Sequence, residues 1–154
     1  MHLWLVPQRA STSTSAYARQ LNAAYTALKS RSGRNRVIGE PRSTRRLDGM
    51  RMDLLGYRPP ANHALEASTL ARLHAAAHKD LFLTGWTLQT DRSSAAATLT
   101  AGYRLARRTA YVYTLGYDGL YDPDTVGPNG RTPTTGLLAD DGSERPAFRA
   151  YKGA

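Results

Sequence analysis

Acidic side chains follow several predicted β-strands, where they could act as general acids, general bases or nucleophiles. In folds with parallel strands, such positions at the carboxyl ends of the strands are where catalytic residues gather. The chain has five of them: Glu40, Asp91, Asp118, Asp122 and Asp124. We take Glu40, Asp91 and Asp118 as the candidate catalytic residues. Asp-Pro and Asp-Gly are ordinary turn sequences, so a turn also explains the aspartates after residue 117, and the arginines around Glu40 also fit an ion-paired loop.

The histidines do not predict a metal site. His74 and His78 are four residues apart on one face of a predicted helix, a spacing that zinc ligands use. The sequence places no further His, Asp or Glu to complete the set, and the chain has no cysteine. It also has no glycine-rich phosphate-binding loop. We therefore expect neither a metal ion nor an organic cofactor.

Hydrophobic periodicity predicts strands that alternate with helices. Apolar residues at helical spacing predict helices over residues 16–30, 64–78, 93–108 and 146–151, and short apolar runs predict strands over residues 36–39, 52–57, 81–84 and 111–117. This alternation predicts an α/β fold with about four parallel strands joined by right-handed crossovers. The segment between Gly39 and Met52 is too short for a regular crossover helix.

Length and composition are those of one globular domain, residues 1–154. Hydrophobic residues make up 41% of the chain and charged residues 21%, which excludes a disordered chain. The first residues, MHLWLVPQ, form a short apolar run cut by Pro7, with no basic segment before it. They predict neither a signal peptide nor a membrane span. We expect a cytoplasmic protein with no membrane partner.

A net charge of +9 makes nucleic acid a candidate partner. The strongest case is the stretch RSGRNRVIGEPRSTRR, residues 31–46, which has six arginines in sixteen residues. A predicted strand interrupts it, and it lacks the interleaved aromatic residues and the motifs of known nucleic-acid binders. We therefore do not expect nucleic-acid binding, and we keep it as an alternative that a steep loss of affinity with added salt would reveal.

Five stretches succeed one another in an order typical of one enzyme group. They are HLWLVPQRASTSTSAYARQLNAAYTALKS, RVIGEP, MDLLGYRPP, LFLTGWTLQTD, and YVYTLGYDGLYD with the closing GLLADDGSERPAFRAYKG. In this order they resemble the second half of a (β/α)8 barrel of the clan-A glycoside hydrolases, which include many cellulase-like enzymes of actinobacterial type. The first stretch resembles the segment after the Asn-Glu-Pro signature at the end of barrel strand four. The other four resemble strands five to eight, and the likeness covers nearly the whole chain.

The resemblance implies a retaining glycosidase mechanism, which needs two carboxyl groups about 5–5.5 Å apart. In that family the nucleophile is a glutamate at the end of strand seven, in a Thr-Glu-aromatic sequence. Thr84 and Trp86 match this sequence, and Gly85 stands at the nucleophile position. The acid/base glutamate of the family would lie just before Met1. The resemblance therefore implies that hydrolysis is impaired or absent.

By the same resemblance, aromatic residues line the open mouth formed by the strand ends. Tyr57, Trp86, Tyr117 and Tyr121 occupy these positions, and aromatic faces stack on sugar rings. Together with Gly85 they form the expected substrate-binding set. Alternatively, these side chains fill a core or an interface without a ligand, because tyrosine combines an apolar ring with a polar tip.

A half barrel of about four strands and three to four helices leaves two open sheet edges, so we expect self-association to complete it. The leading hypothesis is a truncated glycoside-hydrolase-like protein that binds carbohydrate weakly. Three alternatives stay open: a glycosidase that uses carboxylates of a partner chain or Glu40, Asp91 or Asp118; a scaffold protein without a ligand; and a basic nucleic-acid binder.

Overall fold

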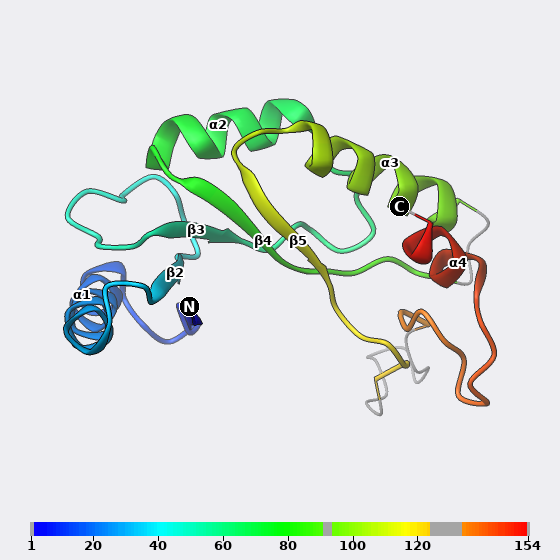
Figure 1. Cartoon of the computed structure of the whole chain (residues 1–154), viewed down its shortest axis with the longest axis horizontal. Coiled ribbons are helices and arrows are strands. Elements are labelled where there is room, and N and C mark those ends of the chain that lie inside the picture. Colours follow the sequence, from blue (N-terminus) through cyan, green and yellow to red (C-terminus); the bar gives the residue numbers. More distant parts are fainter. Residues whose placement is uncertain (1, 91–93, 124–133, 154) are drawn as a thin grey trace. The chain divides into compact units, whose positions relative to one another are not determined.

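Strands and helices alternate along most of the chain (Figure 1). The computed structural model describes residues 2–90, 94–123 and 134–153. Its strands are β1 (Leu3–Pro7), β2 (Arg36–Glu40), β3 (Leu54–Tyr57), β4 (Asp80–Trp86) and β5 (Val112–Tyr117), and its helices are α1 (Thr14–Arg31), α2 (Ala67–Ala77), α3 (Ala95–Arg108) and α4 (Pro146–Lys152). The predicted α/β class is confirmed. No helix in the described ranges has both the length and the apolar character needed to cross a membrane.

The five strands form one parallel sheet in the order β1-β2-β3-β4-β5. Ile38 of β2 lies opposite Leu5 of β1 on one side and opposite Leu54 of β3 on the other. Strands that are consecutive in the sequence are neighbours in the sheet, as in a (β/α)8 barrel. The fold is therefore that of a partial barrel of this kind.

The structure has five strands where about four were predicted, because the opening segment is also a strand. Residues 3–7 pair in parallel with residues 36–40. Leu3, Trp4 and Leu5 are 43–46% exposed at the edge of the described sheet. They form a run without polar alternation, so no periodic pattern indicated a half-buried strand. The expected self-association at this edge stays a prediction.

The chain divides into two compact units. Unit 1 comprises Met1–Arg58, Ala67–Leu83 and Tyr111–Thr114, and unit 2 comprises Pro59–Glu66, Thr84–Ala110 and Leu115–Ala154. Unit 1 contains the first three strands, and unit 2 contains α3 and α4. The prediction of a single domain stays a prediction.

In unit 1, α1 packs against the first two strands (Figure 1). The helix begins after Ser13, whose hydroxyl oxygen accepts a hydrogen bond from the backbone N of Ala16 at 3.2 Å and so caps the helix. Tyr17 and Leu21, four residues apart on one face, are fully buried. The Tyr17 hydroxyl donates to the carbonyl oxygen of Val6 at 2.7 Å, which ties the helix to the end of β1.

The connection between β2 and β3 has no helix, as its length predicted, and α1 holds it in place. The Asn22 amide donates to the carbonyl oxygen of Gly49, and its oxygen accepts from the backbone N of Arg51, both at 2.8 Å. Asp53 pairs with Lys29 of α1 at 2.8 Å. These contacts order a basic loop beside the carboxyl end of β2.

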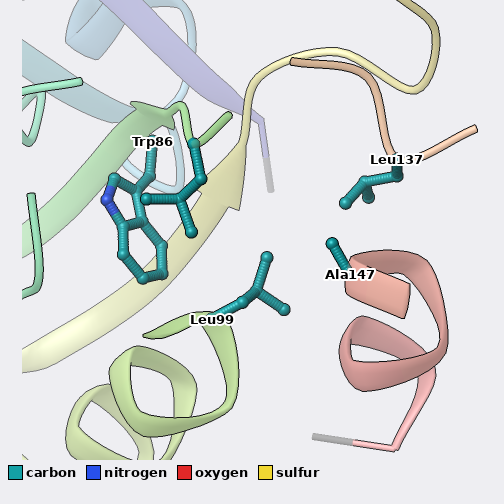
Figure 2. Packing of buried hydrophobic residues seen from close by; sticks show 5 residues of the cluster. Trp86, Leu99, Leu137 and Ala147 are labelled. Atoms are coloured by element: carbon teal, nitrogen blue, oxygen red, sulfur yellow. The ribbon is translucent and has the colours of Figure 1, made fainter. Parts of the chain in front are cut away.

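In unit 2, the core lies between the end of β4, α3 and the C-terminal segment. Its buried residues are Trp86, Leu88, Leu99, Leu137 and Ala147. Figure 2 shows Trp86 on one side of this cluster, Leu137 and Ala147 on the other, and Leu99 directed into the space between them. The rings of Tyr103 on α3 and Tyr151 on α4 meet edge to face, with 5.4 Å between their centroids. The C-terminal helix is thereby fixed to α3.

Candidate functional site

A cavity of about 430 Å³ opens at the carboxyl ends of β1, β2 and β3 in unit 1. Pro7, Glu40 and Tyr57, the last residues of these strands, all line it. The full lining is Pro7, Gln8, Ala10, Glu40, Pro41, Arg42, Tyr57 and Arg58. The cavity lies where barrels of parallel strands place their ligands. It brings together Glu40 and Tyr57, two of the residues predicted from the sequence.

Gln8 fixes the rim of this cavity by joining two loops. Its backbone N donates to the carbonyl oxygen of Glu40 at 3.0 Å, one residue beyond the end of β1. Its side-chain oxygen accepts from the backbone N of Arg42 at 2.9 Å, and its side-chain nitrogen donates to the carbonyl oxygen of Thr12 at 2.8 Å. All three partners are backbone atoms, so Gln8 fixes the main chain of the two loops at the rim. Gln8 was not predicted from the sequence, because its role depends on a contact across 34 residues.

Glu40 and Arg58 bring opposite charges to the cavity. Arg58 Nε lies 3.8 Å from Glu40 Oε1, and the two side chains are 14% (Glu40) and 57% (Arg58) exposed. Gly56 gives the glutamate room, since a Cβ at residue 56 would lie only 3.0 Å from the Cβ of Glu40. The ends of β2 and β3 therefore determine where the two charged groups lie, and the Arg58 side chain is the more exposed of the two.

The groups in the cavity suit binding by hydrogen bonds and ring contacts. A carboxylate accepts hydrogen bonds, a guanidinium donates them, and the half-buried Tyr57 offers a ring with a polar tip. Behind β1, burial raises the pKa of Tyr17, so its hydroxyl stays neutral and serves as a donor to Val6. Among the lining residues Glu40 alone has a carboxyl group. The cavity by itself thus lacks the paired carboxylates of a retaining glycosidase.

Trp86 is the clearest correction to the predicted site. Its side chain was expected at an open mouth, but it has no exposed surface. The indole N–H donates to the carbonyl oxygen of His63 at 3.0 Å, and the ring belongs to the core of unit 2. A fully buried ring has no free face for a sugar. Trp86 therefore fills a core, which was the alternative stated for the aromatic side chains.

Tyr117 also has a structural role in unit 2. Its hydroxyl lies 3.2 Å from both the backbone N and the carbonyl oxygen of Leu88, and it donates to the carbonyl oxygen of Thr135 at 3.0 Å. Burial raises the pKa of Tyr117. Tyr121, by contrast, is 52% exposed. The Tyr117 ring packs against the core of unit 2, whereas the Tyr121 side chain is open to solvent.

Two further predicted residues, Gly85 and Asp118, lie near the ends of β4 and β5. The backbone N of Asp118 donates to the carbonyl oxygen of Trp86 at 2.9 Å, which joins the two strand ends. Asp91 and Asp124 lie outside the described residues. Gly85 has a backbone φ of +59°. Such a left-handed conformation costs a residue with a Cβ roughly 1–2 kcal/mol. The backbone conformation alone therefore favours glycine at position 85.

Asp122 forms a buried ion pair that no sequence pattern predicted. Its carboxylate receives two hydrogen bonds from the Arg145 guanidinium, at 2.7 and 2.8 Å, and one from the backbone N of Gly136 at 2.7 Å. Arg145 also donates to the Thr90 hydroxyl at 2.9 Å. These hydrogen bonds, those of Arg145 first, lower the pKa of Asp122. The aspartate therefore anchors the C-terminal segment.

The histidines take structural positions. His74 stacks on Tyr111 with 4.3 Å between ring centroids, and its Nδ1 lies 2.9 Å from the carbonyl oxygen of Lys79. His78 lies just after the end of its helix with a φ of +50°. Within residues 2–90, 94–123 and 134–153, no three His, Asp or Glu side chains gather as a metal ion would require.

Several solved glycoside hydrolases share this fold, in which parallel strands alternate with helices around a barrel. Solved structures with this fold include an exo-β-1,3-glucanase of family GH128 from Aureobasidium namibiae, with a TM-score of 0.66 and 17% identity over 96% of this chain and 64% of the enzyme. They also include xylanase 10B from Thermotoga petrophila in complex with xylobiose, with a TM-score of 0.61 and 11% identity over 96% of this chain and 56% of the enzyme. Xylanase 10B from Thermotoga maritima has a TM-score of 0.60 and 10% identity over 99% of this chain and 59% of that enzyme.

The likeness to these enzymes is one of fold. No protein-family profile and no curated protein sequence matches the chain. The chain spans 56–64% of the length of the three solved enzymes. The likeness to a glycoside-hydrolase barrel, expected from the sequence, is confirmed at the level of fold.

Proposed function

We propose that this protein binds carbohydrate in the cavity of unit 1 and that its ability to hydrolyse glycosidic bonds is impaired or absent. The observation that carries the proposal is the cavity at the ends of β1, β2 and β3, with Glu40, Tyr57 and Arg58 in its wall. A pocket of a few hundred cubic ångströms with a few polar groups in its wall is typical of small-ligand sites.

Sugar rings match the chemistry of this wall. Their hydroxyl groups donate to a carboxylate such as Glu40 and accept from a guanidinium such as Arg58. Their C–H faces pack on aromatic rings, and Tyr57 supplies one. The glucanase and the xylanases with this fold support a carbohydrate by analogy of fold, and the lining residues supply the chemical argument.

Two positions argue against double-displacement hydrolysis. The family resemblance puts an Asn-Glu-Pro signature at the end of barrel strand four, and β1 ends at Pro7. If the two prolines correspond, Val6 stands at the acid/base position, within this chain rather than before Met1 as expected from the sequence. The same resemblance puts Gly85 at the nucleophile position. Neither valine nor glycine can transfer a proton or attack an anomeric carbon.

Replacement of Tyr57 by alanine should weaken sugar binding about tenfold, because the ring face in the cavity is lost. We suggest isothermal titration calorimetry with a panel of neutral and acidic trisaccharides. Tyr113→Ala is the matched control, since Tyr113 is an exposed tyrosine of β5 that does not line the cavity. If no trisaccharide binds to folded wild-type protein, the proposal fails and the scaffold alternative takes its place.

Hydrolysis is tested with nitrophenyl glycosides, whose leaving group needs little help from an acid. We expect no nitrophenol release above background in plain buffer, because the cavity wall holds only one carboxyl group. Azide can replace a missing nucleophile, so release that requires azide would show that a bound sugar lies beside a position without a nucleophile. Release without azide that Glu40→Gln abolishes would contradict impaired hydrolysis and restore the glycosidase alternative.

A further inference from the structure

We infer that the cavity of unit 1 selects acidic sugars, with Arg58 and Arg42 as the residues that recognise the sugar carboxylate. This inference rests on the proposed carbohydrate binding and names the substrate class of the same site. Two of the eight lining residues are arginines and one is a glutamate, so the wall carries a net positive charge.

Three further arginines lie close in the sequence to residues that line the cavity. Arg9 lies next to Gln8, and Arg45 and Arg46 lie on the loop that continues from Arg42. All three side chains are exposed, and the acidic residues of the same loop are Asp48, which is exposed, and Asp53, which pairs with Lys29. Several cations around a concave site raise the local concentration of anionic ligands.

The arginines are placed to receive a carboxylate. Arg58 directly follows Tyr57 at the end of β3, and its side chain is 57% exposed beside the cavity. The backbone N of Arg42 is fixed by Gln8, which holds the second arginine at the opposite loop. A planar guanidinium can bind both oxygens of a carboxylate at once. A uronic acid supplies that group on the same ring that offers hydroxyls to Glu40.

Glu40 favours an acidic sugar over nucleic acid as the ligand. Its carboxylate lies in the wall with only 14% of its side chain exposed and repels phosphate groups at the centre of the site. A phosphodiester backbone carries one charge per nucleotide, and its sugars offer a carboxylate one hydroxyl each in RNA and none in DNA. A uronate directs its single carboxylate toward the arginines and its hydroxyls toward the glutamate.

The test compares matched acidic and neutral ligands that share the same sugar rings and linkages. Calorimetry at about 10 mM salt and at about 0.15 M salt would use trigalacturonate and its methyl ester, and cellotriose and its uronate counterpart. We expect at least one acid to bind about tenfold tighter than its neutral partner, an advantage that shrinks at the higher salt concentration. Arg58→Gln and Arg42→Gln should each remove most of that advantage. Arg72→Gln, which changes an exposed arginine of α2 outside the cavity, should leave it intact.

The outcomes separate this inference from the proposed function. Equal affinity for the acid and neutral members of both pairs would overturn the selection of acidic sugars and leave carbohydrate binding in place. Failure of all four sugars to bind would overturn both. A single-stranded oligonucleotide that binds more tightly than the uronates and loses affinity with Arg58→Gln would overturn the inference in favour of nucleic acid.

Discussion

Replacement of Asp122 by alanine is expected to lower the free energy of unfolding by about 3 kcal/mol. The side chains of Asp122 and Arg145 are only 7% and 16% exposed, and two hydrogen bonds join them. Removal of the aspartate leaves the Arg145 charge buried without its counter-ion and leaves the backbone N of Gly136 without its partner. Urea denaturation monitored by circular dichroism would measure the loss.

The control for this prediction is an exposed ion pair in the same unit. Lys152 Nζ lies 2.8 Å from Glu144 Oε1, with side chains 55% and 39% exposed. Exposed pairs contribute at most about 1 kcal/mol, so Glu144→Ala should change stability little. Equal losses for Asp122→Ala and Glu144→Ala would contradict the view that Asp122 anchors the C-terminal segment.

The Asp122 effect depends on pH in a defined direction. Hydrogen bonds from Arg145 lower the pKa of Asp122 in the folded protein below the ordinary value of 3.8. The contribution to stability is therefore fully present above the unfolded-state pKa and is lost as the pH falls through the folded-state pKa. The difference between wild type and Asp122→Ala should be constant near neutral pH and should shrink below about pH 4.

Substitution of Gly102 by alanine is expected to destabilise the protein by about 2 kcal/mol. A Cβ at residue 102 would lie 2.4 Å from Cη2 and 2.6 Å from Cζ3 of Trp86. The indole is completely buried and its N–H is bound to His63, so it cannot move aside without a cost. Alanine would gain about 1 kcal/mol of helix propensity over glycine, and the clash outweighs that gain. Urea denaturation of the two proteins side by side would measure the difference.

The direction of the stability change on Gly102→Ala distinguishes a crowded position from an open one. In a helix with free space, Gly→Ala would stabilise, so a stabilised Gly102→Ala variant would contradict the packing of Trp86 on α3. Gly33→Ala serves as the control, because no atom lies within 4 Å of the added methyl group. It should leave stability unchanged or raise it by up to about 1 kcal/mol.

Regular elements could be predicted from the sequence wherever one face is buried. In α1, Tyr17 and Leu21 are spaced for one buried side, and in α3 the same holds for Leu99 and Ala106, all of them buried. The helices were therefore found to within a few residues. β1 was missed because its apolar residues are exposed on an edge strand and have no polar alternation.

The site could be predicted only in part, because strand ends are visible in a sequence and loop contacts are not. Glu40 and Tyr57 lie at the ends of two predicted strands and were found for that reason. The roles of Gln8 and Arg42 depend on a hydrogen bond between segments that no local pattern relates. Trp86 could not be assigned to the core, since its burial depends on the absence of a side chain at Gly102 of the next helix.

The proposed sugar site lies at the carboxyl ends of β1, β2 and β3. Backbone amide chemical shifts, monitored by NMR while neutral or acidic trisaccharides are added, test it most directly in a chain of 154 residues. We predict shift changes at Gln8, Arg42, Tyr57 and Arg58. Saturating changes confined to the region of Tyr117 and Tyr121, or no changes with any sugar, would contradict it.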